Sequence, residues 1–311
     1  MNIVYLGTPD FAVAPLKAIV ESGKYNVVAV VTNCDKPVGR KKILTAPPVK
    51  IYAESKGIKV FQYEKIRCEG VEDMKSLAPD LMITCAFGQI LSQEILDIPK
   101  FGVFNIHASL LPKYRGASPV HAAILNGEEQ TGITIMKTDI GIDTGDIILS
   151  ELIDIDKEET CGQLFDRLSI LGAESILKAL SLLETNKITF TKQNNQLATF
   201  SKMIKKQDAF INFNDSAKNI VNKIRAYNPS PIAFVVLDKL PFKIYKARIE
   251  KQKTHLQVGE IEIQNGKIFV GCKDCAIELL IVQKAGGKAI CANDFLRGNT
   301  LPKFFKEELN D

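Results

Sequence analysis

The first half of the chain alternates short runs of apolar, β-branched residues with segments of helical periodicity. The strand-like runs are NIVYL (2–6), NVVAVVT (26–32), IKVFQ (58–62), DLMITCAF (80–87) and GVFNIHA (102–108). Helical patterns at 12–23 and 47–57 separate the first three runs. Strands separated by helices predict a doubly wound α/β domain, a mostly parallel sheet covered on both faces. Such sheets bind ligands beyond the carboxyl ends of their strands.

Local signals set the limits of this first domain. Gly7 ends the first run, and Thr8 is expected to cap the next helix with Pro9 at its first position. Gly23 is expected to stop that helix. Residues 162–185 form a long amphipathic pattern, which predicts one helix or a pair of helices that closes the domain near residue 189.

The last third of the chain follows a different pattern. Residues 190–206 are polar and aperiodic, which is typical of a linker between domains 1–189 and 207–311. Short strand-like segments with turn residues between them follow, at 224–238, 242–249, 259–272 and 275–283. This spacing predicts a small β-barrel, and we expect an OB-like domain.

Composition places the chain among ordinary globular proteins. It has 311 residues, of which 46% are hydrophobic and 24% are charged. No stretch approaches the roughly 18 uncharged apolar residues of a membrane span, and the N-terminus has no basic signal-peptide region. Seven cysteines without framework spacing suggest reduced thiols, so we expect a cytoplasmic protein. The single CKDC motif (272–275) lacks a second pair, which favours a turn between strands over a metal site.

Charge is distributed unevenly along the chain. Residues 1–189 hold 20 Lys/Arg and 24 Asp/Glu, a net charge of −4. Residues 190–311 hold 20 Lys/Arg and 12 Asp/Glu, a net charge of +8, which together give the overall +4. A basic last third is consistent with a polyanionic partner, and equally with a lysine-rich solvated face.

Two polar side chains stand at the end of the strand-like run 102–108. Residues two apart in a strand face the same side, so Asn105 and His107 are expected to point together. Pro112 then prevents the strand from continuing. The pair is a candidate site, or His107 is a hydrogen-bonded structural histidine. His121 begins a helical run and His255 lies in a polar stretch, so neither is a candidate.

A second segment, KTDIGIDTGDII (137–148), is rich in Asp and Gly. It carries Asp139, Asp143 and Asp146 among Gly141 and Gly145. Taken alone, this composition is typical of a turn between two strands. The alternative is a loop that brings a carboxylate to a neighbouring catalytic group, and the local pattern favours the turn.

Taken together, these segments resemble the folate-dependent formyltransferases. The motifs that carry the resemblance are FNIHASLLPKYRGASP (104–119) and TGITIMKTDIGIDTGDI (131–147), with YLGTPDFA, TNCDKPVGRKKILTAPPVK, IRAYNPSPIAF and QKAGGKAI outside them. LGTPDF does not match the G-x-G-x-x-G pattern of a nicotinamide dinucleotide site, and no P-loop is present. The resemblance covers nearly the full length of the chain.

The resemblance implies a reaction and its residues. The formyl donor would be 10-formyltetrahydrofolate, and the acceptor would be initiator methionyl-tRNA. The reaction would need no metal, and the protein would be a monomer. Asn105, His107 and Asp143 would be catalytic. The folate site would comprise Phe87, Gly88, Leu91, Ser109, Leu110, Leu111, Pro112 and Asp139. Contacts to tRNA would come from Lys36, Arg40, Lys41, Lys42, Lys205, Lys206 and Arg225.

Three other readings remain open at this stage. A glycinamide ribonucleotide formyltransferase would end near the first domain. A sugar-nucleotide formyltransferase would keep the second domain but need no basic surface. A non-enzymatic nucleic-acid-binding protein would leave Asn105, His107 and Asp143 without a purpose.

Overall fold

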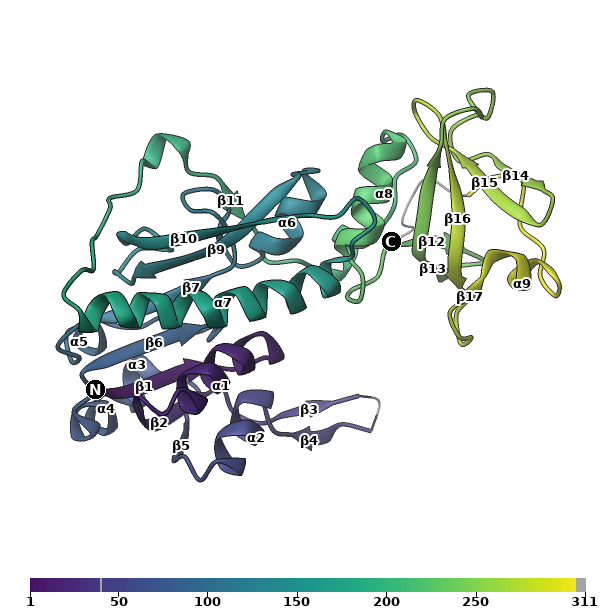
Figure 1. The fold of residues 1–311 in the computed structure, drawn as a ribbon. Coiled ribbons are helices and arrows are strands. Elements are labelled where there is room, and N and C mark those ends of the chain that lie inside the picture. Colours follow the sequence, from purple (N-terminus) through teal and green to yellow (C-terminus); the bar gives the residue numbers. More distant parts are fainter. Residues whose placement is uncertain (40, 306–311) are drawn as a thin grey trace. The chain divides into compact units, whose positions relative to one another are not determined.

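The computed structural model describes residues 1–39 and 41–305, which form two compact units (Figure 1). The first unit comprises Met1–Pro119, Gln130–Asp154 and Phe165–Ser201. The second comprises Val120–Glu129, Ile155–Leu164 and the chain from Lys202 onward. Among the described residues, no helix is both long enough and apolar enough to cross a membrane.

A seven-stranded sheet forms the centre of the first unit. Its strands, in the order in which they pair, are β10 (Ile147–Asp154), β9 (Gln130–Lys137), β7 (Val103–His107), β6 (Leu81–Cys85), β1 (Asn2–Gly7), β2 (Asn26–Thr32) and β5 (Val60–Gln62). The strands from β7 to β5 are parallel, and β9 and β10 are antiparallel to their neighbours. The predicted mostly parallel α/β sheet is therefore confirmed.

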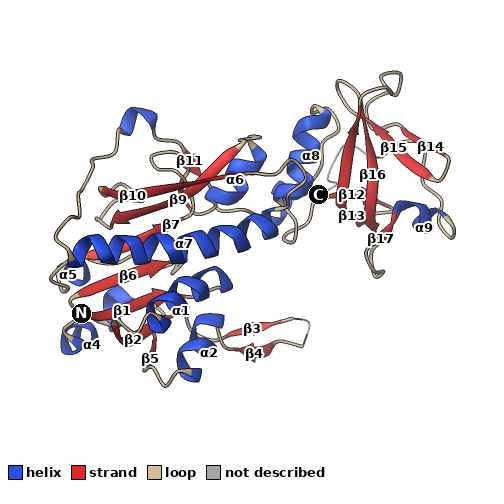
Figure 2. Ribbon diagram, in the orientation of Figure 1, coloured by secondary structure: helices blue, strands red, loops and turns tan. Residues whose placement is uncertain are grey.

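Helices cover both faces of this sheet (Figure 2). They are α1 (Val13–Glu21), α2 (Pro48–Ser55), α3 (Ile66–Glu69), α4 (Val71–Leu77), α5 (Gln93–Leu96) and α7 (Cys161–Glu184). Val4 and Leu6 of β1 pack in one cluster with Ile66, Met74 and Ile95, which lie on the three short helices. The alternate residue Tyr5 lies towards the other face, where its hydroxyl donates to Ala12 O at 2.7 Å. The predicted pattern at 162–185 is one continuous helix, α7.

Strand order reverses between β1 and β6. The chain runs outward from β1 through β2 to β5 and then returns to the other side of β1 with β6 and β7. The loops after β1 and β6 therefore diverge at a topological switch point, where open α/β sheets bind ligands.

The expected helix cap at Thr8 is wrong. A short 3-10 helix, Asp10–Ala12, follows β1, and neither it nor α1 has a side-chain cap. Thr8 Oγ1 instead accepts a hydrogen bond from Asn33 N at 3.2 Å and donates to Phe87 O at 3.4 Å. Because Thr8 stands at the switch point, its hydroxyl joins the loops after β2 and β6.

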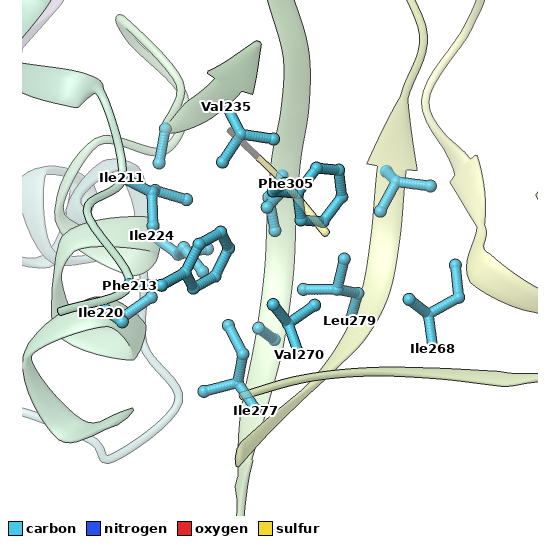
Figure 3. Packing of buried hydrophobic residues seen from close by; sticks show 14 of the residues in the cluster. Ile211, Phe213, Ile220, Ile224, Val235, Ile268, Val270, Ile277, Leu279 and Phe305 are labelled. Carbon is cyan, nitrogen blue, oxygen red and sulfur yellow. The ribbon is translucent and has the colours of Figure 1, made fainter. Parts of the chain in front are cut away.

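An antiparallel sheet forms the second unit. Its strands are β12 (Phe234–Leu237), β13 (Leu240–Glu250), β16 (Ala276–Gln283), β15 (Lys267–Gly271) and β14 (Ile261–Gln264), paired in that order, with β17 (Ile290–Cys291) on β16. Its helices are α8 (Ala217–Ala226) and α9 (Ala292–Leu296). Figure 3 shows the core between α8 and the sheet, where Ile220 and Ile224 of the helix approach Phe213, Val270 and Ile277.

One sequence expectation for this unit needs correction, and another is not confirmed. Residues 224–226 belong to the end of α8 and not to a strand; the strand begins at Phe234. Among the described strands, no pairing joins β12 to β14, so the sheet is an open path and a closed OB-like barrel is not confirmed. The CKDC motif lies in the turn between β15 and β16, as expected.

The segment expected to be a linker makes specific contacts with the first unit. Thr191 and Ile147 exchange two backbone hydrogen bonds of 2.8 Å. β11 (Phe200–Ser201) pairs with β8 (Arg115–Gly116). Residues 190–201 therefore form a strap along the first unit, and the boundaries at 189 and 207 stay a prediction.

We expect the stability of the second unit to fall below about pH 6.5. His121, on α6 (Pro119–Leu125), lies 6.4 Å from the Tyr227 ring, and burial holds the pKa of this histidine below its ordinary value of 6.5. The unfolded chain binds a proton at His121 more readily than the folded chain does. The contribution of this residue to the free energy of unfolding is therefore fully present above about pH 6.5 and is lost as the pH falls. Melting temperatures between pH 5 and 8 should fall more steeply for the wild type than for His121→Gln; equal slopes would contradict this.

Candidate active site

Asn105 and His107 are the third and the last residue of β7, towards the carboxyl edge of the parallel part of the sheet. Asn105 lies opposite Thr84 on β6, and His107 lies opposite Thr134 on β9. The residues between and before them, Phe104 and Ile106, are buried in the core. Strand alternation therefore places the two polar side chains on one face, as the sequence predicted.

The side-chain amide of Asn105 has a hydrogen-bonded oxygen and an NH2 group that is available to donate. Its Oδ1 accepts a hydrogen bond from Thr84 Oγ1 at 3.0 Å. Across residues 1–39 and 41–305, its Nδ2 makes no hydrogen bond, although the side chain is only partly exposed. A fixed amide with a free N–H group is suited to donating to a ligand oxygen.

Each ring nitrogen of His107 has a polar neighbour. Its Nε2 lies 3.1 Å from Tyr114 O, and its Nδ1 lies 3.6 Å from Asp143 Oδ2. A carbonyl can only accept, so Nε2 carries a proton and donates it to Tyr114. His107 is 6% exposed, so its ring is almost fully enclosed by the protein.

Asp143 reaches His107 from the loop between β9 and β10. Its Oδ2 accepts a 2.7 Å hydrogen bond from Gly116 N, and its backbone has φ of +51°, a left-handed conformation that is uncommon for a non-glycine residue. A Cβ on Gly145 would lie 1.7 Å from Lys137 O, so this loop closes only with glycine at that position. The segment is thus both a turn between strands and a carboxylate-bearing loop.

Asp139, which was assigned to the folate site, lies in the same loop. Its Oδ1 accepts hydrogen bonds from Gly141 N at 3.0 Å and from Thr144 Oγ1 at 2.6 Å. The side chain is exposed. Asp139 therefore stabilises the fold of the loop, and its contact with folate stays a prediction.

The segment 109–112 is anchored beside His107. Thr134 Oγ1 donates to Ser109 O at 2.7 Å and accepts from Leu111 N at 3.1 Å. Ser109 is fully buried and its hydroxyl donates to Lys113 O, whereas Leu110 and Pro112 are partly exposed. This backbone is rigid, so its exposed edge is preorganised for a ligand.

The segment after β6 presents its backbone more than its side chains. Phe87 and Leu91 pack in the core cluster with exposures of 4% and 7%. Gly88 is exposed, with φ of +77°. Asn33 Nδ2 donates to Phe87 O at 2.9 Å, and Gln89 Nε2 donates to Asn33 Oδ1 at 2.7 Å. Because a polar network fixes this loop, the groups it can offer a heterocycle are mainly backbone N–H and C=O groups.

The basic residues assigned to tRNA differ in their exposure. The expected loop at 35–44 is a hairpin of β3 (Lys36–Val38) and β4 (Ile43–Thr45), with Lys36, Lys41 and Lys42 exposed. Arg40 lies outside the described residues. Lys205 and Lys206 are exposed.

Arg225 differs from the other basic residues of this group. It is about half buried, and it donates to Asn222 Oδ1 at 3.1 Å and to Asp156 O at 3.2 Å. Burial lowers its pKa from the ordinary value. These bonds give the guanidinium a structural role within the second unit and occupy part of its donor capacity.

Several residues of the site were not found from the sequence. Thr84, Tyr114 and Gln193 contact the candidate residues through single hydrogen bonds or backbone atoms. None has a local signature, because its partner lies on another element. Across the described ranges, no group of three or more His, Cys, Asp or Glu is arranged to hold a metal ion.

Solved structures share this fold. The chain superimposes with a TM-score of 0.69 on a sugar 3N-formyl transferase, WlaRD, solved with dTDP and 5-N-formyl-THF, at 23% identity over 93% of this chain and 99% of that one. It superimposes with a TM-score of 0.65 on the N-formyltransferase of Helicobacter canadensis at 24% identity, covering 89% and 97% of the two chains. At these identities the likeness establishes the fold.

Sequence comparisons establish the family. The formyl transferase family model matches residues 1–180, and its C-terminal domain model matches residues 203–300. The methionyl-tRNA formyltransferase of Alkaliphilus metalliredigens is 42% identical over 97% of both chains, and that of Geobacter metallireducens is 42% identical over 96% of both. The chain therefore belongs to the formyl transferase family, within the group of methionyl-tRNA formyltransferases.

Proposed function

We propose that this protein transfers the formyl group of 10-formyltetrahydrofolate to the α-amino group of methionine on initiator tRNA. The observation that carries the proposal is the 42% identity to methionyl-tRNA formyltransferases, which extends over 97% of both chains and so includes the second domain. The excess of basic residues in 190–311 supports a polyanionic acceptor over a free sugar nucleotide.

The carboxyl edge of the sheet supports a folate site. β6 and β7 are neighbouring strands, and the loops that follow them lie on either side of the Asn105 position. Hydrogen bonds from Asn33 and Thr134 fix the backbone of these two loops. Exposed backbone at Gly88 and around Leu110 can pair with the donor–acceptor edge of a pterin. The formyl group carried by such a ligand would then lie near Asn105 and His107.

In the proposed mechanism, the amine attacks the formyl carbon and a tetrahedral intermediate forms with a negative oxygen. The free Nδ2–H of Asn105 donates to this oxyanion. The Nε2–H of His107 is the proposed second donor; it donates to Tyr114 O in the structure and would exchange this acceptor for the oxyanion. One donor of this type contributes about 3–4 kcal/mol of transition-state stabilisation.

Asp143 completes the proposed mechanism. Its carboxylate lies 3.6 Å from His107 Nδ1 and is held by Gly116 N. It orients the ring and, directly or through one water molecule, takes the proton that the attacking amine loses. Collapse of the intermediate breaks the bond to the folate nitrogen, which receives a proton as tetrahydrofolate leaves.

The test is formylation with purified components. We expect the protein to consume 10-formyltetrahydrofolate only when methionylated initiator tRNA is present, releasing tetrahydrofolate and forming formylmethionyl-tRNA in equal amounts. A dTDP-amino sugar and uncharged tRNA serve as control acceptors. Turnover with the sugar and none with the charged tRNA would contradict the proposed acceptor while leaving the formyl transferase assignment intact.

A further inference from the structure

A buried arginine and a glutamine connect the strap to the Asp143 loop. Arg115 is 3% exposed, and its Nε and Nη2 donate to Gln193 Oε1 at 3.0 and 2.7 Å. Nη2 also donates to Asn195 Oδ1 at 2.8 Å. None of the ion pairs found in residues 1–39 and 41–305 includes Arg115. A buried cation held by amide oxygens strongly polarises those amides.

The other end of the same glutamine binds the loop backbone. Gln193 Nε2 donates to Asp143 O at 2.8 Å and to Gly145 O at 2.7 Å. Arginine can only donate and the two carbonyls can only accept, so this network fixes the orientation of the amide. Gln193 thus links the buried Arg115 to the backbone of the Asp143 loop through a continuous chain of hydrogen bonds.

The position of this contact suggests what it does. Asp143 has a left-handed backbone, a conformation that persists only when its surroundings impose it. Its carbonyl is held by Gln193 and its carboxylate by Gly116 N, which directly follows Arg115. Arg115 and Gln193 therefore fix both the loop and the strand that meet at the carboxylate.

We propose that Gln193, supported by Arg115, is a positioning residue that sets the Asp143 carboxylate against His107. This inference rests on the proposed function for its kinetic consequence. Glutamine fits the position because it combines an acceptor with two donors; glutamate offers no donor, and asparagine is one methylene shorter. A displacement of the carboxylate by about 1 Å can cost up to a hundredfold in rate.

Two substitutions separate positioning from folding. Gln193→Glu retains acceptors for Arg115, so we expect a folded protein, but it sets oxygen against Asp143 O and Gly145 O, and kcat should fall by about tenfold or more. Gln193→Met loses both contacts and should slow turnover at least as much. The KM values for folate and tRNA should change little. The matched controls are Gln196→Glu and Gln196→Met, at an exposed position of the same segment.

Hydrogen exchange of the full-length protein tests the positioning role of Gln193 independently of catalysis. Gly116 N–H, bound to Asp143 Oδ2, should exchange faster in both Gln193 variants than in the Gln196 controls and the wild type. Unchanged exchange, or normal kcat in a folded Gln193→Glu enzyme, would overturn the inference. A wild type that exchanges as expected but does not formylate would contradict the proposed function instead.

Discussion

Replacing His107 with alanine is expected to lower the turnover of formyl transfer by about a hundredfold or more, with a modest change in folate binding. The ring is buried, lies 3.6 Å from Asp143 and carries its Nε2 proton at the edge of the sheet where the substrates are proposed to meet. Its removal takes away the proposed oxyanion donor and the neighbour of the Asp143 carboxylate together. Single-turnover formylation, measured beside folate binding, gives the two quantities separately.

Asn105 provides the companion test of the same unit. Asn105→Ala should slow turnover by a similar factor, because only its Nδ2 is available to the oxyanion. The double variant with His107→Ala should lose less than the product of the two single effects, since members of one catalytic unit are not additive. Near-normal turnover of His107→Ala would contradict the proposed catalytic role of this residue. Its melting temperature serves as the control for folding.

The strand that carries the proposed catalytic residues could be predicted from the sequence because the signals that define it are local. Alternation alone places Asn105 and His107 on one face, and Pro112, which follows the strand-like run, locates them at the edge of the sheet. The approach of Asp143 could not be derived in this way. It depends on β9 lying next to β7 and on the closed turn at Gly145, so only the resemblance to known formyltransferases suggested it.

Two departures from the local sequence pattern have a common physical cause. Threonine is a common helix cap, but the hydroxyl of Thr8 lies at the switch point and makes hydrogen bonds to the loops after β2 and β6. In the segment 190–201, Gln193 and Asn195 accept hydrogen bonds from the buried Arg115, and Gln193 donates to two carbonyls of the first unit. In both cases long-range partners decide the conformation, and local composition does not identify them.

The second unit shows the same limit. The sequence pattern assigns residues 224–226 to the strand-like segment 224–238. Yet α8 ends at Ala226, and its buried Ile220 and Ile224 pack on the sheet (Figure 3). Sheet closure is likewise invisible in the sequence, since the strand spacing is the same for a barrel and an open sheet.

The second large effect is expected in tRNA binding. Lys205 and Lys206 are exposed and belong to the basic last third of the chain, residues 190–311. Residues 1–189, by contrast, carry a net negative charge. Replacing both with glutamate should weaken tRNA binding by about tenfold to a hundredfold at low salt, because two phosphate contacts become repulsive. The turnover of bound tRNA should change little, since neither lysine belongs to the proposed catalytic unit.

The salt dependence distinguishes lost phosphate contacts from a general loss of charge. Each lost contact lowers the slope of log affinity against log salt by about 0.7–0.9, so the deficit should shrink by about tenfold between roughly 50 and 200 mM salt. The control is Lys17→Glu with Lys24→Glu, which changes net charge equally at exposed positions of the first unit. Filter binding across a salt series measures both variants. If the control lost as much affinity and slope as the Lys205 and Lys206 variant, the basic residues at the start of the second unit would have no special part in holding the tRNA.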